Sequence, residues 1–248
     1  IYTILFVGSV RCVQETALLL TIIPSILILL YFFLSDRFKE PKGTIALIFF
    51  LGILICLPAG IINGFMNDNF NDGSDLSEKL YSSFLGPAWA EELLKFVILY
   101  FVVLRRNEFN EPMDGLVYGV VVSLGFATYE NYTYVYEWAS TIAAEENLDF
   151  TKFSYIVAKA RSYSAIPLHG LNGAVMGYYF GLYAFSGKKK YLILSLILPY
   201  LFHGFYNFLG WPNMLVIIGI LIIYSLALHS NLRRLQLAKK KEHENLKI

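Results

Sequence analysis

The chain has 248 residues, of which 56% are hydrophobic and 16% are charged, and its formal net charge at pH 7 is +1. Because ordinary soluble domains carry about 25% charged residues, this composition excludes a soluble protein of the usual kind. Apolar runs near the roughly 20-residue spanning length recur along the chain, and the segments between them are too short for a separate soluble domain. We therefore predict an all-α, polytopic transmembrane helical bundle that forms one domain over residues 1–248.

Taken in chain order, the apolar runs predict about seven spans, at residues 17–34, 44–65, 81–104, 115–138, 163–186, 191–209 and 214–231. The opening run IYTILFVGSV is too short to span alone. Since the chain starts at Ile, this run is read either as the remnant of an upstream segment, which makes an eighth span, or as an interfacial helix. Arg11 follows the run, which argues against a signal peptide. Cys12 and Cys56 match no metal or disulfide spacing and are predicted to be packing residues.

Lys and Arg fall in alternate loops. The stretches SDRFKEPKG, RRNEFNEPMD and GKKK and the basic tail 232–248 are rich in these residues. The intervening loops are acidic, uncharged or, at 139–162, of mixed charge. The excess of basic residues marks the cytoplasmic side, so the tail is predicted to be a cytoplasmic anchor at the lipid bilayer and not a nucleic-acid binder.

Ionisable residues interrupt several of these spans. Glu91 and Glu92 are adjacent within PAWAEELLKFVILYFVVL, and Glu130, His169 and His203 lie in three later spans. Each charged residue at the centre of a bilayer costs about 2.5–3.5 kcal/mol on insertion scales. Counting helical rise from the span ends places these residues about 9–15 Å below the outer surface. A common depth predicts one buried polar site in the outer half of the membrane.

Lys95 is three residues after Glu92 and four after Glu91, so its ammonium can reach either carboxylate along one helix face. One interpretation is therefore a purely structural ion pair between Glu92 and Lys95. That pair leaves Glu91 without a cation of its own, and such a carboxylate in a low-dielectric site is a candidate general base.

Prolines and regularly spaced glycines occur in the same spans. Pro87, Pro167 and Pro199 precede three of the polar positions by two to four residues, and each is expected to kink its helix beside a hydrated pocket. Glycine recurs every fourth residue after His169, which predicts a ridge that another helix approaches closely. The ridge consists of Gly173, Gly177 and Gly181.

Four segments, in chain order, carry a resemblance to a known family: EELLKF, MDGLVYGVVVSLGFATYEN, PLHGLNGAVMGYYFG and LPYLFHGFYN. They resemble the successive motifs of the PrsW family of intramembrane proteases, which is related to the CAAX prenyl protease superfamily. The resemblance runs from Gly86 to Asn207, within a motif-bearing core at 81–209. It implies a multi-pass protease of the bacterial plasma membrane that cuts a membrane-anchored anti-sigma factor on its extracytoplasmic side.

The resemblance also implies which residues form the site. Its essential acids correspond to Glu91 and Glu92, joined by Glu130 and Asn131 of the FxxxEN motif and by the histidines of the later spans, His169 and His203. The wider superfamily has His where Glu130 stands, so the role of that position is not transferred.

The same residues suit peptide hydrolysis on chemical grounds. Glu91 is predicted to deprotonate water, and Lys95 to keep Glu92 ionised and oriented. His203 and Asn207, one turn apart, are predicted to donate hydrogen bonds to the oxyanion. With no Ser-His-Asp arrangement and no Cys-His pair, covalent catalysis is disfavoured.

Zinc is an open alternative to a metal-free glutamate mechanism. Zinc hydrolases use three protein ligands and keep one position for water. Here the candidate ligands are His169, His203 and one glutamate, for which Glu130 is chosen although Glu91 and Glu92 also qualify. Without an HExxH motif, this set is assembled across helices.

Other functions remain compatible with a buried Glu and His cluster. A proton-coupled transporter or channel places such groups at mid-depth, with a polar path that continues to the cytoplasmic side. A CAAX-type prenyl-protein endopeptidase and a receptor that uses the cluster only structurally are further alternatives.

Overall fold

The computed structural model describes residues 2–71 and 73–245, with side chains at 12–71 and 73–238, and within these ranges it contains helices and no strand. The α-helices are α1 (Tyr2–Ser35), α2 (Lys42–Leu54), α3 (Cys56–Phe70), α4 (Asp75–Leu80), α5 (Pro87–Phe101), α6 (Pro112–Tyr132), α7 (Ala139–Glu145), α8 (Phe150–Tyr163), α9 (Ala165–Ser186), α10 (Lys189–Leu209) and α11 (Met214–Asn245). Two π-helical segments, η1 (Tyr81–Leu85) and η3 (Thr133–Trp138), and a short 3-10 segment, η2 (Val103–Arg105), complete the fold. The all-α prediction is confirmed.

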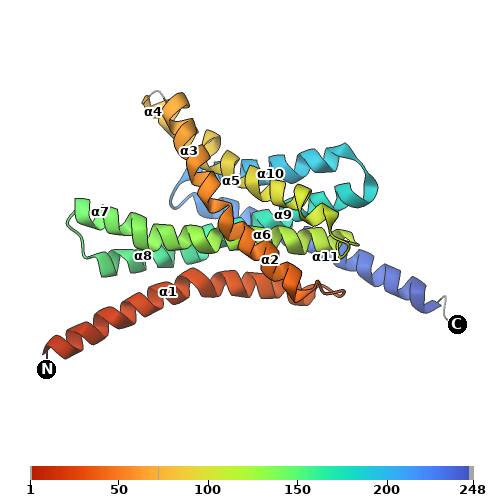
Figure 1. The fold of residues 1–248 in the computed structure, drawn as a ribbon, viewed down its shortest axis with the longest axis horizontal. Coiled ribbons are helices and arrows are strands. Elements are labelled where there is room, and N and C mark those ends of the chain that lie inside the picture. The colour runs from red at the N-terminus through yellow and green to blue at the C-terminus, as the bar shows by residue number, and fades with distance from the viewer. Residues whose placement is uncertain (1, 72, 246–248) are drawn as a thin grey trace.

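Each of the predicted spans coincides with helix. Within the described residues, four segments are long and apolar enough to cross a membrane on their own: Cys12–Ser35, Lys42–Phe70, Lys189–Leu209 and Met214–Ala238. The other predicted spans correspond to α5, α6 and α9, which carry Glu91, Glu92, Glu130 and His169, whereas His203 lies on α10. Most of α6 and α9 is buried. Figure 1 shows α6 in the middle of the molecule, with α2 crossing it obliquely, α1 on one side and α5 and α10 on the other. This arrangement is a multi-pass helical membrane bundle.

The boundaries of several elements differ from the prediction. The opening run does not stand apart, because α1 continues without a break from Tyr2 into the first predicted span. The second predicted span is divided at Ile55 into α2 and α3. The segment 139–162, predicted to be a loop, folds into α7 and α8, which lie side by side (Figure 1). Asp149 starts α8 because its side chain accepts a hydrogen bond from the Lys152 N–H at 3.1 Å, a standard helix cap.

The prolines do not all kink helices, which corrects the prediction. Pro87 is the first residue of α5, directly after η1, and Pro167 lies in the first turn of α9. Backbone N–H groups in a first turn have no intrahelical partner, so proline there starts a helix without losing a hydrogen bond. Pro199 alone of the three lies inside its helix, α10.

The predicted glycine ridge on α9 is confirmed, and it meets a second one on α6. A Cβ atom added at Gly177 would lie 2.7 Å from the carbonyl carbon of Gly115, and one at Gly119 would lie 2.8 Å from the Cα of Gly177. Real Cβ atoms do not approach backbone so closely, so the two helices touch through their main chains. We call this contact the glycine seam; it comprises Gly115, Gly119, Gly173, Gly177 and Gly181.

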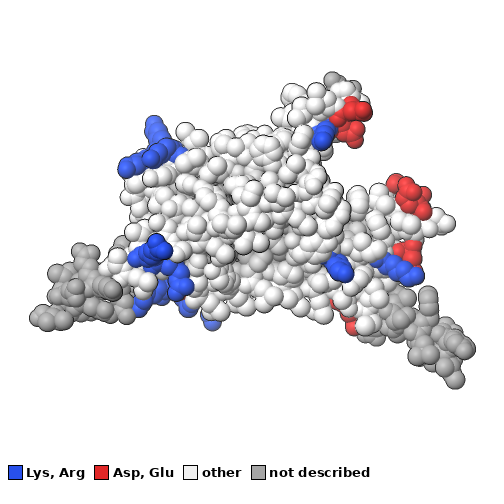
Figure 2. All heavy atoms as spheres, turned by 180° about the vertical axis from the view of Figure 1, so that it is seen from behind, with Lys and Arg blue, Asp and Glu red and all other residues white. Residues whose placement is uncertain are grey.

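Charged residues are unevenly distributed over the surface. Figure 2 shows Lys and Arg gathered at one end of the face drawn, whereas Asp and Glu lie at the opposite end with a few basic residues. The exposed run Lys188–Lys190 lies where the turn after α9 leads into the first residues of α10. The separation of charge agrees with the alternation of basic loops along the chain, from which the orientation in the membrane is predicted.

Candidate active site

The ionisable residues of α5 form a buried group. Glu91 and Glu92 lie on adjacent positions, and Lys95 lies one turn later with its Nζ 2.8 Å from Glu92 Oε1 and 3.7 Å from Glu91 Oε2. Glu92 and Lys95 are 0% exposed and Glu91 is 5% exposed. The predicted pair of Glu92 and Lys95 is therefore present, and Glu91 has the longer contact with the ammonium. Glu91 Oε2, the oxygen that faces the ammonium at 3.7 Å, and Glu92 Oε2 are both buried without a hydrogen-bond partner.

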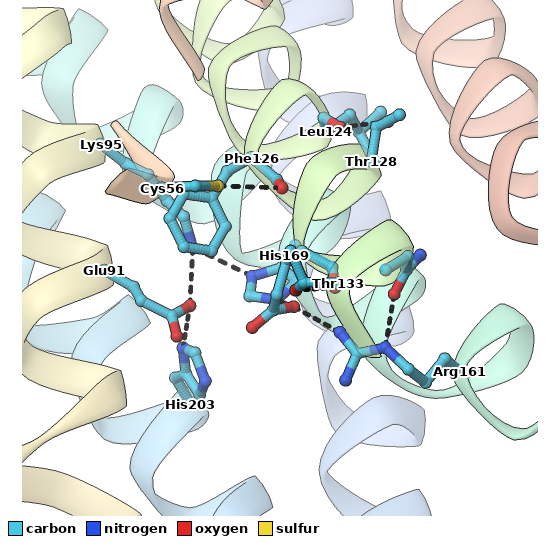
Figure 3. A network of polar contacts seen from close by, with 12 residues as sticks. Cys56, Glu91, Lys95, Leu124, Phe126, Thr128, Thr133, Arg161, His169 and His203 are labelled. Atoms are coloured by element: carbon cyan, nitrogen blue, oxygen red, sulfur yellow. Dashed lines mark hydrogen bonds and ion pairs between the residues drawn. The ribbon is translucent and has the colours of Figure 1, made fainter. Parts of the chain in front are cut away.

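Two histidines from α9 and α10 complete the group, with ring centres 5.3 Å apart (Figure 3). His203 Nδ1 lies 2.9 Å from Glu92 Oε1, so this nitrogen carries a hydrogen and donates a hydrogen bond to the carboxylate. His169 has Lys95 Nζ 2.9 Å from its Nδ1 and Glu130 Oε2 3.0 Å from its Nε2. The ammonium only donates, so His169 Nδ1 accepts and His169 Nε2 donates to Glu130. Both rings are thereby fixed in orientation and tautomer.

Glu130, near the end of α6, is held by an arginine that the sequence did not single out. The Arg161 guanidinium, from α8, pairs with Glu130 Oε2 and donates from Nε to Asn131 Oδ1 at 2.6 Å. It also lies over the ring of Tyr134, 4.0 Å from the ring centre. Figure 3 shows Arg161 reaching across from its own helix toward His169. Asn131 is fully buried and does not line the cavity described below, so it acts only by orienting Arg161.

Replacing Arg161 by methionine is expected to reduce both stability and proteolysis. Losing a hydrogen bond to a charged group costs about 1.5–3 kcal/mol, and Glu130 would then no longer orient His169. Arg161→Lys keeps the charge but not the planar pair of donors, so it should restore only part of both properties. Unfolding of the detergent-solubilised variants measures the first effect and cleavage of a reconstituted substrate the second.

Lys159→Ala provides the control, because Lys159 is exposed on the same helix. Wild-type stability in Arg161→Met would contradict the role of the guanidinium in holding Glu130.

A cavity of about 330 Å³ opens onto these residues. Its lining includes Glu91, Glu130, His169, His203 and Asn207 among the predicted residues, together with Pro87, Tyr134, Arg161 and Tyr206. A neighbouring cavity of about 170 Å³ shares Glu91 and Glu130 and is otherwise lined by residues of α3, α5, α6 and η3, including Cys56. Glu91 and Glu130 therefore lie between two spaces, each large enough for several waters at about 30 Å³ apiece.

Metal-ligand geometry is present in the same place. Glu91, Glu92, His169 and His203 each offer an atom within 4.8 Å of the others. Glu130, the glutamate chosen from the sequence, instead contacts His169 and Arg161. Carboxylate oxygens and imidazole nitrogens are zinc ligands, and the two unpartnered glutamate oxygens leave donor atoms available. The donor set thus fits zinc, although Lys95 already contacts Glu92 and His169.

The charges of the group do not cancel. Three carboxylates, of Glu91, Glu92 and Glu130, face two cations, Lys95 and Arg161, in the described ion pairs. With both histidines neutral, one negative charge remains. A metal cation or a proton at this position would offset it.

All eight predicted site residues come from α5, α6, α9 and α10, and the structure brings them to one region. Sequence reasoning missed Arg161 because it assigned 139–162 to a loop, and it did not single out Tyr134 within the predicted span 115–138. One signal was present: Arg161 is a basic residue beside a span on the side predicted to be extracytoplasmic, where such residues are scarce.

Comparisons with known proteins show which family the whole chain resembles. Residues 40–229 match the model of a family described as PrsW family intramembrane metalloprotease. Protease PrsW of Bacillus subtilis is 35% identical over 193 residues, which cover 76% of this chain and 79% of that protein. The Geobacillus kaustophilus Protease PrsW is 34% identical over 189 residues, covering 75% and 76%. Protease PrsW of Clostridioides difficile is 28% identical over 239 residues, covering 92% and 95%.

No solved structure matches the chain. The family match extends from the segment before α2 into α11 and so includes every helix that carries a site residue. The described helices supply apolar spans for a multi-pass membrane protein, and the relatives are bacterial peptidases by name. This chain belongs to the PrsW family of intramembrane metalloproteases.

Proposed function

We propose that this protease cuts a single-span membrane protein near its extracytoplasmic side, with Glu91 as the base that activates water. The main support is the position of Glu91, which lines both cavities and has one buried oxygen without a hydrogen-bond partner. A general base needs access to its water as well as a lone pair free to accept the proton. Glu92 has Lys95 and His203 as partners of one oxygen and does not line either cavity.

The remaining groups suit the other parts of the reaction. Asn207 lines the larger cavity and can donate its amide N–H to an oxyanion. His203 donates Nδ1–H to Glu92, so its Nε2 is an acceptor while the ring is neutral. His203 therefore suits proton transfer or metal ligation, and it donates to an oxyanion only when protonated. This modifies the role predicted from the sequence.

Zinc, when bound, supplies a Lewis acid that polarises the scissile carbonyl and lowers the pKa of water. Glu91, Glu92, His169 and His203 would hold it. In the metal-free mechanism Glu130 and Lys95 orient His169, and a metal on one of its ring nitrogens would replace one of these two contacts. In either mechanism Arg161 keeps Glu130 in place.

The two histidine variants His169→Ala and His203→Ala are each expected to lower the zinc content of the purified protein, because each removes an imidazole donor from a shared site. Metal analysis by mass spectrometry, at matched protein concentration, measures the content. Proteolysis that resists chelators, in wild-type protein without stoichiometric metal, would favour the glutamate mechanism.

An anti-sigma factor is the proposed substrate, on the strength of the family resemblance alone. The geometry suits any single-span protein whose backbone is extended near the outer surface. An unpaired backbone group is costly in lipid, so the substrate helix should unwind where water can reach it.

We expect cleavage outside or just within the outer leaflet, with release of an extracytoplasmic fragment. Mass spectrometry of both products from a reconstituted substrate locates the cut. A cut in the inner half of the substrate span would contradict either the orientation or the site.

A transporter gains no support from the cavities. Both cavities that contain Glu91 and Glu130 are lined by residues from one half of α6 and α9, and none comes from 112–125 or 170–186. In the other half, at 112–125 and 170–186, the two helices are in contact along the glycine seam.

A further inference from the structure

A second group of buried carboxylates lies at the other end of α6. Asp36 and Glu40 come from the segment between α1 and α2, and Asp114 comes from the first turn of α6. Their exposed fractions are 2%, 4% and 0%, and each offers an oxygen within 4.8 Å of the others. Asp114 precedes Glu130 by 16 residues, or about 24 Å along the helix, so this acidic group is separate from the active site.

Each carboxylate uses one oxygen to hold the surrounding structure. Asp114 Oδ2 accepts from the N–H groups of Asn110 and Glu111, both at 2.8 Å. Asp36 Oδ1 accepts from the Phe38 N–H at 3.1 Å and from the Gln236 amide at 2.8 Å. Glu40 Oε2 accepts from the hydroxyl of Tyr118.

The second carboxylate oxygen of each aspartate, in contrast, accepts no hydrogen bond. Asp36 Oδ2 and Asp114 Oδ1 are buried and have no hydrogen-bond partner. A buried carboxylate oxygen without a partner is costly, and here two of them belong to the same small group. They are the atoms that a ligand would satisfy.

The acidic group also lacks a cation. Within the described part of the chain, no Lys, Arg or His nitrogen lies within 4.0 Å of the carboxylate oxygens of Asp36, Glu40 or Asp114. The neighbouring Lys39 instead donates to backbone carbonyls at the end of α1, with Nζ–O distances of 3.0–3.3 Å. Three carboxylates this close together, with no cation in direct contact with their oxygens, repel one another.

We propose that Asp36, Glu40 and Asp114 bind a hard divalent cation, Mg²⁺ or Ca²⁺, at the end of the bundle that carries the basic loops. The donors are all oxygens, which these cations prefer, and neither His nor Cys is among them, unlike a zinc site. A cavity of about 370 Å³ is lined in part by Gln236, whose amide also donates to Asp36 Oδ1 of the group. The bound cation would join the α1–α2 segment to the start of α6.

Titration of the EDTA-treated full-length protein in detergent tests the site. Calorimetry with CaCl₂, and separately with MgCl₂, should show saturable binding of one ion, and thermal unfolding should shift upward by about 2–4 °C at saturation. Asp114→Asn should weaken this binding at least tenfold. Its amide oxygen can still accept from the Asn110 and Glu111 N–H groups, so the start of α6 is kept.

Three further variants make the result specific. Asp36→Asn should also weaken binding, and it replaces Asp114→Asn if that variant does not fold. Glu78→Gln, at an exposed carboxylate of α4, and His169→Ala, in the active site, should both bind the ion as the wild type does.

Two results would overturn the proposal: no saturable binding of either ion, or binding that Asp114→Asn and Asp36→Asn leave unchanged. If the wild type binds no ion and Asp114→Asn unfolds at a higher temperature, the carboxylates share a proton instead of binding a cation.

Discussion

Glu91→Gln is expected to reduce cleavage of a reconstituted single-span substrate by about 10²–10⁴-fold, the usual contribution of a general base. Glutamine keeps the size of the side chain and one carbonyl oxygen but accepts no proton from water. Folding should survive, because Glu91 has the longer contact with Lys95 and lines a cavity. Initial rates of product formation and the unfolding temperature, measured on the same preparation, separate the two effects.

Two variants serve as controls for this experiment. Glu145→Gln removes an exposed carboxylate on α7 and should leave the rate unchanged. Glu92→Gln removes the partner of both Lys95 and His203 and should lower stability as well as activity. If Glu91→Gln kept its activity while Glu92→Gln folded normally and lost it, the base would be Glu92.

The second large effect is expected on stability, from Gly177→Ala in the glycine seam. The added methyl group would meet the backbone of Gly115 and Leu116, and backbone cannot move aside as a flexible side chain can. Overpacking of this kind costs about 1–3 kcal/mol, although alanine in a helix is intrinsically favoured over glycine by about 1 kcal/mol. Chemical unfolding of the detergent-solubilised protein should therefore show a clear loss of stability.

Gly219→Ala is the matched control. Gly219 lies in α11, where nothing is within 4 Å of the added Cβ. The same substitution should there leave stability unchanged or raise it, because only the helix propensity acts. A loss of the same size in both variants would show that the seam contact is not the cause.

Much of the fold follows from the sequence, because lipid selects for long apolar helices. Every predicted span coincides with helix, and the spacing of Glu91, Glu92 and Lys95 correctly gave their contact along one helix face. The glycine repeat on α9 likewise predicted that another helix packs closely against it. These features depend on residues within one helix, where periodicity fixes which side chains are neighbours.

The features that sequence reasoning missed depend on contacts between distant segments. The ion pair of Arg161 and Glu130 joins residues 31 positions apart and depends on α8. That helix is amphipathic, and its stretch of the sequence is too polar to be read as a span. The partner of the α9 ridge, at Gly115 and Gly119, was likewise hidden, since one chain's pattern does not reveal which helix it meets. Asp36 and Glu40 belong to the basic segment SDRFKEPKG, in which nothing indicates that these two side chains are buried.

The glycine seam has a mechanical consequence for substrate entry. Because α6 and α9 touch through their main chains, no compressible layer of side chains lies between them, and the pair should move as one rigid unit. Glu130 and His169 belong to this unit, so their contact should persist while the enzyme opens. Glu91 and His203 belong to α5 and α10, which contact the unit through the side chains of Lys95 and Asn172. Admission of a substrate helix should therefore displace α5 and α10 and bring the reacting groups together only when they return.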